Sequence, residues 1–409
     1  MKWAIKAGAI LNPEGVAKDN VAIISGEMVE STGKSIDPNI PFVDIPEGIL
    51  CPGLINSHDH LIGNYYPKVG NGPYESWLPW DNDLKSAPLY RERQQIENRD
   101  LYLLGAYKNL LSGVTTVSDH IPKFVAEPYY DYLPMKPIRN YNLAHSIGSA
   151  ALIWGGEIVD EYAQAVANDG PFITHIAEGF DLETLRDLET LEKKGGLGSH
   201  SVLVHGISFS EANMDKIKKV GASVVWCGDS NMFMFNKTAN IKMLLDKGVN
   251  VCIGTDSPMS GGINLLEEIR FDKKLYKELS GEELSDLQIF KMITENPVKA
   301  FKLWDNGKVK KDYRADLVVF RDTHGKNPSS VVNARLKDIK LVVVDGNPAY
   351  ADAEFDFLFN KLKINYEKIT VEGESKIVIG NLIGLLQRIS RAVGFKKTYP
   401  FLPVEFNFE

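Results

Sequence analysis

The chain has 409 residues, a formal net charge of −8 and 44% hydrophobic residues, which fits a folded enzyme-sized protein and excludes wholesale disorder. The excess of 54 acidic over 46 basic residues argues against a general nucleic-acid binder, which needs a basic surface. The three cysteines, Cys51, Cys227 and Cys252, are too few and too scattered for a disulfide framework or a cysteine-based zinc site. The eight histidines are the informative residue type.

The first fifty residues contain short strand-like segments broken by Gly, Pro and Asn, at residues 4–11, 21–24 and 42–45. Lys6 interrupts the apolar stretch that a signal peptide would need, and there is no run of about 18 apolar residues for a membrane span. We therefore expect a cytoplasmic protein that begins with a small β domain.

From about residue 50, apolar strands alternate with helical periodicity. The expected helices cover residues 91–111, 182–194, 210–220, 237–247 and 265–279. Alternation of this kind over roughly 260 residues is typical of a (β/α)₈ barrel, which needs about 250. The pattern predicts an α/β fold with a distorted (β/α)₈ TIM barrel as the catalytic domain, over residues 51–311.

Strand character returns at residues 315–320 and 341–345. We expect residues 1–50 and 312–365 to form one small β-sandwich domain from both chain ends. Residues 366–409 are expected to be a C-terminal extension, with a basic amphipathic helix over 377–393. Packing of this helix on its own domain, or on a second copy in a homodimer, is favoured over contact with a membrane surface.

Four strand-like segments end in side chains that can bind metal ions. These residues are His58 and His60, then His175, His205 and Asp256. In an α/β barrel, catalytic groups lie at the C-terminal ends of the strands, and residues two apart on a strand share a face. A lone histidine at a strand end is more often structural, so the prediction depends on five such residues in order. Three imidazoles and a carboxylate suit Zn²⁺, or alternatively Fe²⁺, with a position open for water.

These motifs resemble those of a known family. Residues 52–60 (PGLINSHDH) are similar to the opening motif of the amidohydrolase superfamily. Residues 175–178 (HIAE) resemble the HxxE motif of its branch that contains cytosine, guanine and adenosylhomocysteine deaminases and triazine chlorohydrolases. Residues 205–206 (HG) and 254–256 (GTD) match later positions of that branch, and 227–231 (CGDSN) resembles its CPxSN segment, with Gly228 in place of proline.

The resemblance covers roughly residues 1–350 and implies a ligand set of His58, His60, His175 and Asp256. It also implies that Glu178 is the proton shuttle, that His205 hydrogen-bonds the attacking hydroxide or the substrate, and that Asp256 accepts a proton from water. A site with two metals would need a lysine at the end of the fourth strand. Lys123 and Lys136, the only lysines in residues 109–180, do not suit that position, so one divalent ion is expected.

The implied reaction is hydrolytic deamination of a small amino-substituted nitrogen heterocycle, of purine, pyrimidine or pterin type. Trp77 and Trp80, in an aromatic-rich loop, are expected either to stack on such a ring or to pin the loop to the barrel. The other candidate substrate contacts are His120, His145 and Asn231, the two histidines being equally compatible with structural roles.

Two alternatives stay open. The same site could hydrolyse a C–Cl bond or a cyclic amide C–N bond. In a different class, the chain would be a non-catalytic metal-binding or membrane-associated binding protein. The presence of Glu178 beside the full ligand set argues against the second alternative, because a scaffold has no use for a proton shuttle.

Overall fold

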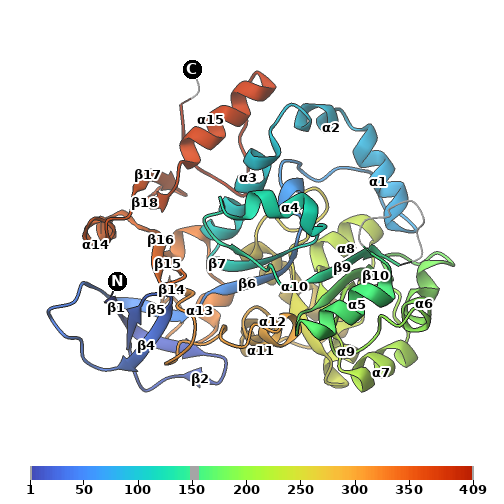
Figure 1. Cartoon of the computed structure of the whole chain (residues 1–409), viewed down its shortest axis with the longest axis horizontal. Coiled ribbons are helices and arrows are strands. Elements are labelled where there is room, and N and C mark those ends of the chain that lie inside the picture. The colour runs from blue at the N-terminus through green and yellow to red at the C-terminus, as the bar shows by residue number, and fades with distance from the viewer. Residues whose placement is uncertain (1, 148–155, 408–409) are drawn as a thin grey trace.

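The computed structural model describes residues 2–147 and 156–407. Within them the chain forms a ten-stranded mixed sheet, a five-stranded sheet and a three-stranded sheet, and most of the helices lie around the two smaller sheets (Figure 1). The architecture is α/β, as the alternation of strands and helices predicts.

The two smaller sheets are parallel throughout. The three-stranded sheet contains β6 (Leu54–Asp59), β7 (Val114–Asp119) and β8 (Lys136–Pro137). The five-stranded sheet contains β9 (Asn142–Ser146), β10 (Phe172–Ile176), β11 (Ser201–His205), β12 (Ser223–Trp226) and β13 (Asn250–Ile253). A parallel bridge between Asp59 and Asp256 links the two sheets, and the Asp256 N–H donates to the His58 carbonyl oxygen at 3.0 Å. The ends of β6 and β13 are thereby held side by side.

The helices follow the expected pattern with adjusted ends. They are α1 (Trp77–Ser86), α2 (Pro88–Arg93), α3 (Asn98–Leu111), α4 (Lys123–Tyr130), α5 (Ile158–Ala167), α6 (Asp187–Lys193), α7 (Glu211–Val220), α8 (Gly228–Phe235), α9 (Ile241–Asp246), α10 (Leu265–Ser280), α11 (Asp286–Met292), α12 (Glu295–Phe301), α13 (Ser329–Val332), α14 (Asp356–Leu362) and α15 (Leu382–Val393). The helix expected over 91–111 is divided, because Glu97 adopts an extended conformation and starts α3 anew. The helix expected from 237 begins at 241, where the Asn240 side chain caps the Met243 N–H.

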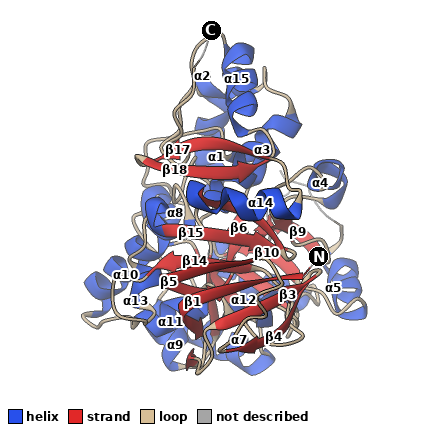
Figure 2. Ribbon diagram, turned by 90° about the vertical axis from the view of Figure 1, so that its left-hand side faces the viewer, coloured by secondary structure: helices blue, strands red, loops and turns tan. Residues whose placement is uncertain are grey.

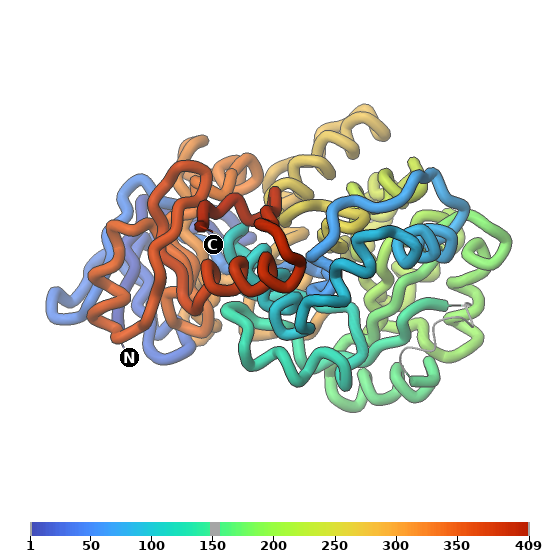
Figure 3. The backbone as a smooth tube through the Cα atoms, turned by 90° about the horizontal axis from the view of Figure 1, so that it is seen from above, coloured from blue at the N-terminus to red at the C-terminus, as the bar shows by residue number. Residues whose placement is uncertain are grey.

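The mixed sheet is built from both ends of the chain. Its N-terminal strands are β1 (Lys2–Asn12), β2 (Gly15–Val16), β3 (Val21–Ser25), β4 (Met28–Gly33) and β5 (Phe42–Pro52). Its C-terminal strands are β14 (Leu317–Arg321), β15 (Ile339–Val344), β16 (Asn347–Asp352), β17 (Tyr366–Val371) and β18 (Glu374–Ile379). The order is β17-β18-β16-β15-β14-β5-β1-β3-β4, with β2 paired to β1, and the two halves meet where β14 pairs with β5 (Figure 2). From above, the N-terminal strands (blue) and the orange-red strands that precede the C-terminal helix lie together at one end of the molecule (Figure 3).

The sheet extends beyond residue 365, where the sequence pattern predicts a separate extension to begin. β17 and β18 form a hairpin whose turn residues Glu372 and Gly373 have φ values of 50° and 81°. Positive φ at both central residues matches the twist of the flanking strands, so the hairpin forms readily. The segment after 365 therefore adds two strands to the sheet before the C-terminal helix begins.

The C-terminal helix α15 packs on its own chain. Its buried residues are Leu382, Leu385, Leu386, Ile389 and Ser390, and the helix contacts α3. On its outer side, Arg388 pairs with Asp100 of α3 through Nη2–Oδ1 at 2.7 Å and Nε–Oδ2 at 3.0 Å. The apolar face of the helix is thus covered by the protein itself. Among the described residues, no helix is long and apolar enough to cross a membrane.

A single residue, Gly53, separates β5 of the mixed sheet from β6 of the three-stranded sheet. A Cβ atom at position 53 would lie 2.1 Å from Thr115 Oγ1, so only glycine allows β6 to approach β7 at this point. The Gly53 N–H donates to the Asp316 carbonyl oxygen at 2.7 Å. The strand that carries His58 is therefore anchored directly to the mixed sheet.

Candidate metal centre and active-site cavity

The four side chains expected as metal ligands lie together. His58 Nε2 and His175 Nε2 are 3.2 Å apart, and Asp256 Oδ1 lies 3.4 Å from His60 Nε2 and 3.8 Å from His58 Nε2. His58 belongs to β6 and His175 to β10, and Asp256 is the third residue after the end of β13. The C-terminal ends of three strands thus bring four donor groups to one point.

The electrostatics of this cluster suit a bound cation. Burial, together with the neighbouring imidazoles, holds the pKa values of His58 and His175 well below the usual range. Both rings are therefore neutral at physiological pH, which is the form that binds metals. Two neutral ring nitrogens facing each other beside a carboxylate oxygen form a donor set suited to Zn²⁺ or Fe²⁺.

Neighbouring groups fix the orientation of these donors. Asp256 Oδ2 accepts hydrogen bonds from Ser230 Oγ at 2.7 Å and Ser260 Oγ at 2.8 Å, which leaves Oδ1 for the histidines. His175 Nδ1 donates to the backbone carbonyl oxygen of His145 at 2.8 Å, so the Nε2 lone pair points toward His58. Asp256 itself has φ of 56°, and His205 has φ of 75°. Such left-handed backbone is uncommon outside glycine and concentrates at functional sites.

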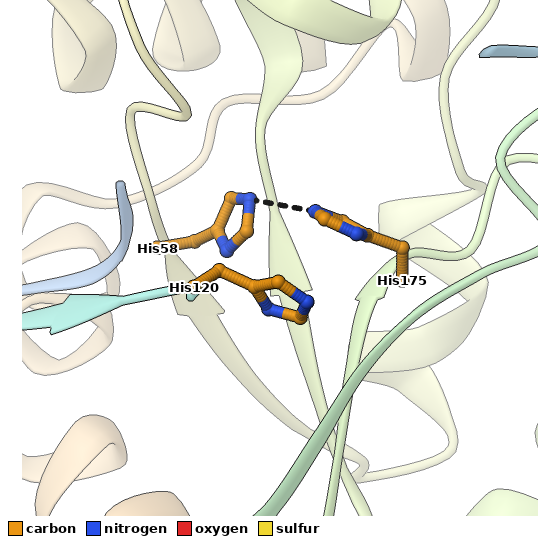
Figure 4. Close-up of side chains that lie close together, drawn as sticks. All are labelled: His58, His120 and His175. Carbon is orange, nitrogen blue, oxygen red and sulfur yellow. Dashed lines mark hydrogen bonds between the residues drawn. The ribbon is translucent and has the colours of Figure 1, made fainter. Parts of the chain in front are cut away.

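His120, which the sequence offers only as a candidate substrate contact, lies within the cluster. Its ring centroid is 3.9 Å from that of His175, and its Nε2 donates to the His145 carbonyl oxygen at 3.2 Å. One ring nitrogen from each of His58, His120 and His175 lies within 4.8 Å of the others (Figure 4). The available sequence signal is that His120 directly follows β7, in the same way that His205 ends β11.

Glu178 and His205 form a second polar pair beside the donors, with Glu178 Oε1 3.5 Å from His205 Nε2. Burial raises the pKa of Glu178 well above its usual range, and the negative charges of Asp256 and Asp187 raise it further. His205 Nδ1 donates to Asn231 Oδ1 at 2.9 Å, and burial lowers the pKa of His205. The raised pKa favours the protonated form of the Glu178 carboxyl group beside the imidazole, which suits Glu178 to deliver a proton.

A cavity of about 340 Å³ opens beside these groups. The side chains that line it include His60, His145, His175, Glu178, Asp256, Tyr66, Trp77, Trp80, Tyr90, Lys85 and Arg93. Trp80 Nε1 also donates to the Val69 carbonyl oxygen at 2.8 Å, so this tryptophan both pins its loop and forms part of the wall. The cavity offers a flat ring an aromatic surface next to the polar cluster.

Asn231 was expected to contact substrate but does not line this cavity. It is fully buried behind His205, and its Nδ2 donates to Thr238 Oγ1 at 3.1 Å. Its contact is therefore with a predicted catalytic residue, because the side chain points from α8 toward β11. His120 and His205 are likewise outside the lining.

The two lysines weighed for a second metal have other partners. Lys136 Nζ pairs with Asp316 and with Asp345, the latter at 2.9 Å, on the side of the mixed sheet. Lys123 Nζ lies over the ring of Tyr141, 5.2 Å from its centroid. Both lysines thus have partners other than the histidine cluster.

Gly228, which replaces the proline of the CPxSN segment, also has a structural explanation. A Cβ atom at this position would lie 1.9 Å from Asp272 Oδ1, and Asp272 is fully buried. The bulkier residue is excluded because α10 places a carboxylate against the start of α8. Packing of Asp272 against this position therefore explains why glycine stands where the motif has proline.

Comparisons with known proteins agree with this geometry. The model of the amidohydrolase family matches residues 163–349. The 5-methylthioadenosine/S-adenosylhomocysteine deaminase of Pyrococcus furiosus is 26% identical, with 89% of this chain and 97% of that protein covered. The protein of the same name from Clostridium tetani is 30% identical, with 74% and 81% covered.

Solved structures share the fold at lower identity. The zinc complex of atrazine chlorohydrolase from Arthrobacter aurescens superposes with a TM-score of 0.70 at 18% identity, covering 85% of this chain and 95% of that one. With the Clostridium tetani relative at 30% identity, the sequence motifs and the shared fold lead to one assignment. The chain belongs to the amidohydrolase family.

Proposed function

We propose that the protein is a metal-dependent hydrolase that deaminates a small amino-substituted nitrogen heterocycle, such as a purine, pyrimidine or pterin. The observation that carries the proposal is the pairing of Glu178, whose pKa burial raises, with His205 at 3.5 Å beside the metal donors. The names of the Pyrococcus and Clostridium relatives support the same chemistry. A non-catalytic binding protein would have no need of a buried carboxyl group with a raised pKa at this place.

The donor set supports one divalent ion, Zn²⁺ or alternatively Fe²⁺, held by His58, His60, His175 and Asp256. Such an ion lowers the pKa of a bound water to about 7 and so makes a nucleophile available at neutral pH. Asp256, anchored through Oδ2 by two serine hydroxyls, keeps Oδ1 in place to ligate the ion and to accept a proton from water.

The remaining steps depend on side chains of this chain. Glu178 donates its proton to a ring nitrogen, so that the carbon next to it can accept the oxygen without leaving negative charge on the ring. His205, oriented by Asn231, contacts the reacting oxygen through Nε2. The C–N bond to the amino group then breaks, and ammonia leaves after receiving the proton that Asp256 took from water. The hydroxyl proton on the attacked carbon returns to Glu178, which leaves a carbonyl group in the product and restores the acid. The tryptophans of the wall keep bulk water from the ring.

We further propose that the eight strands from β6 to β13 form a distorted (β/α)₈ barrel, and that the mixed sheet is the core of the small β-sandwich domain. The parallel pairing within both smaller sheets and the Asp59–Asp256 bridge support this arrangement. The two-residue strand β8 accounts for the distortion.

An ammonia-release screen with metal-loaded protein tests the function across aminopurines, aminopyrimidines and pterins. We expect turnover of at least one class, and loss of that turnover in Glu178→Gln. Release of chloride from a chlorotriazine, or a ring-opened product from a cyclic amide, would instead establish one of the alternative reactions. Metal analysis should find about one ion per chain; a consistent two would contradict the single-ion site.

A further inference from the structure

Two basic side chains line the same cavity as the metal donors. Lys85 lies near the end of α1, and Arg93 is the last residue of α2. Both face a space whose walls include Tyr66, Trp77 and Tyr90. The proposed reaction of a flat heterocycle uses neither cation, so their presence needs a separate explanation.

The two cations differ in how they are paired. Lys85 Nζ lies 2.5 Å from Asp81 Oδ2, one helical turn earlier, so its charge is largely matched. Arg93 donates from Nη2 to the amide oxygen of Asn98 at 3.3 Å, and it has no carboxylate partner among residues 2–147 and 156–407. The guanidinium is only partly exposed, so water screens its charge incompletely. An unpaired, half-buried guanidinium is a ready site for an oxyanion.

The acids of the cavity do not neutralise Arg93. Asp256 is directed at the histidines by its two serine partners, and Asp81 is occupied by Lys85. Glu178 faces His205.

We propose that the substrate carries an oxyanion group, a carboxylate or a phosphate, which Arg93 binds with help from Lys85 while the heterocycle stacks against the aromatic wall. This inference rests on the proposed function, because it names the substrate class of the same site. A guanidinium binds either oxyanion through two parallel N–H···O hydrogen bonds, so the shared chemistry is an anionic substituent.

Matched pairs of compounds test the proposal by ammonia release. The pairs are adenosine with adenosine 5′-monophosphate, and pterin with pterin-6-carboxylate. We expect the anionic member of at least one pair to be preferred, and Arg93→Met to lower its kcat/KM about 10- to 100-fold. The neutral member should change by less than about twofold. The carboxylate and phosphate pairs distinguish the two oxyanions.

Arg91→Met is the matched control, because Arg91 lies on the same helix but is exposed and does not line the cavity. It should leave both members of each pair unchanged. Lys85→Met is a second variant and should give a smaller loss than Arg93→Met, because Lys85 is already paired. Equal loss for neutral and anionic compounds in Arg93→Met would overturn the proposal.

Calorimetric binding of the same pairs separates failure of this proposal from failure of the proposed function. If no compound releases ammonia, the deaminase function fails, but tighter binding of anionic compounds that is lost in Arg93→Met still supports the oxyanion site. If ammonia is released with no preference for the anionic member, the function stands and the oxyanion site is refuted. Equal binding of both members by the wild-type protein also refutes it.

Discussion

The backbone carbonyl oxygen of His145 accepts a hydrogen bond from His175 Nδ1 at 2.8 Å, and it also accepts one from His120 Nε2 at 3.2 Å. A carbonyl oxygen cannot donate, so His175 must carry its proton on Nδ1 and keep its Nε2 lone pair for a metal. The main chain of β9, not a side chain, therefore sets the tautomer of a candidate metal donor.

This relationship predicts different outcomes for two histidine variants. His145→Ala keeps the carbonyl group and should retain close to the wild-type metal content. His60→Ala removes a donor and should lose the metal. Metal analysis after dialysis of the two purified variants measures the difference, and full retention in His60→Ala would show that the ligand set is wrong.

The serine hydroxyls of Ser230 and Ser260 donate hydrogen bonds to Asp256 Oδ2. We therefore expect a reduced metal affinity in Ser230→Ala and in Ser260→Ala. Each substitution removes one hydrogen bond that orients the carboxylate, and such losses typically weaken metal binding about 10- to 100-fold. Competition with a chromophoric chelator measures the affinity. Ser118→Ala is the control, because Ser118 is also buried but its hydroxyl has no hydrogen-bond partner among the described residues. Unchanged affinity in both serine variants would exclude this role.

Glu178→Gln should retain the metal and lose about 10²- to 10⁴-fold in kcat, because the amide cannot deliver a proton to the ring. Steady-state kinetics on the best substrate of the ammonia screen measures the loss of kcat, and metal analysis of the same preparation measures the retention of metal. A variant with near-wild-type kcat would remove Glu178 from the proton transfer.

Asp119 predicts a pH dependence of stability. Burial raises its pKa from 3.8 to about 7, and nearby Asp59 adds to this, while the Leu61 N–H opposes it. The folded chain therefore keeps a proton that the unfolded chain releases, so this contribution to stability is present below about pH 4 and is lost as the pH rises toward 7. The difference in pKa corresponds to about 4 kcal/mol at most.

Asp119→Asn stays neutral and can still accept from the Leu61 N–H, which bonds Asp119 Oδ1 at 3.0 Å. Raising the pH from about 5 to about 8 should therefore lower the Tm of the wild-type protein more than that of the variant. Thermal unfolding at the two pH values measures both changes. Equal changes in Tm would mean that the buried carboxyl group is already ionised at the lower pH.

We expect substitutions on the buried and the exposed face of the C-terminal helix to differ in how much they lower the free energy of unfolding. Leu385 is fully buried, and Leu385→Ala should lower the free energy of unfolding by about 2–5 kcal/mol. Arg388→Ala breaks a pair in which the arginine side chain is 45% exposed, and it should cost no more than about 1 kcal/mol. Urea unfolding of both variants measures this difference. Similar small costs would mean that α15 contributes little to the fold.

The clustering of the four candidate metal donors could be predicted because each follows an apolar strand in the sequence. His120 and His145 could be placed near strand ends, but their contacts with His175 could not be predicted. Those contacts depend on how β7, β9 and β10 approach one another, and single-sequence periodicity carries no such information. β8 could not be predicted from the sequence, because two residues are too few to show a strand pattern.

The C-terminal hairpin illustrates a different limit. Residues 366–371 and 374–379 flank a Glu-Gly pair, which is a recognisable turn signal. The helical periodicity over residues 377–393 is strong, so the sequence pattern indicates one amphipathic helix and not a hairpin followed by a helix. Whether a short β segment joins a sheet depends on a free edge, and that edge is supplied by β16, which is itself paired through β15 to the distant N-terminal strands.

The one-residue link at Gly53 has a consequence for synthesis on the ribosome. β5 continues through Gly53 into the strand that bears His58, but its neighbour β14 begins only at Leu317. A nascent chain has therefore exposed every metal donor, including Asp256, well before the edge beside β5 can be closed. The pairing of β5 with β14 is therefore a late step, which the chain can make only after the whole segment from β6 to β13 has been synthesised.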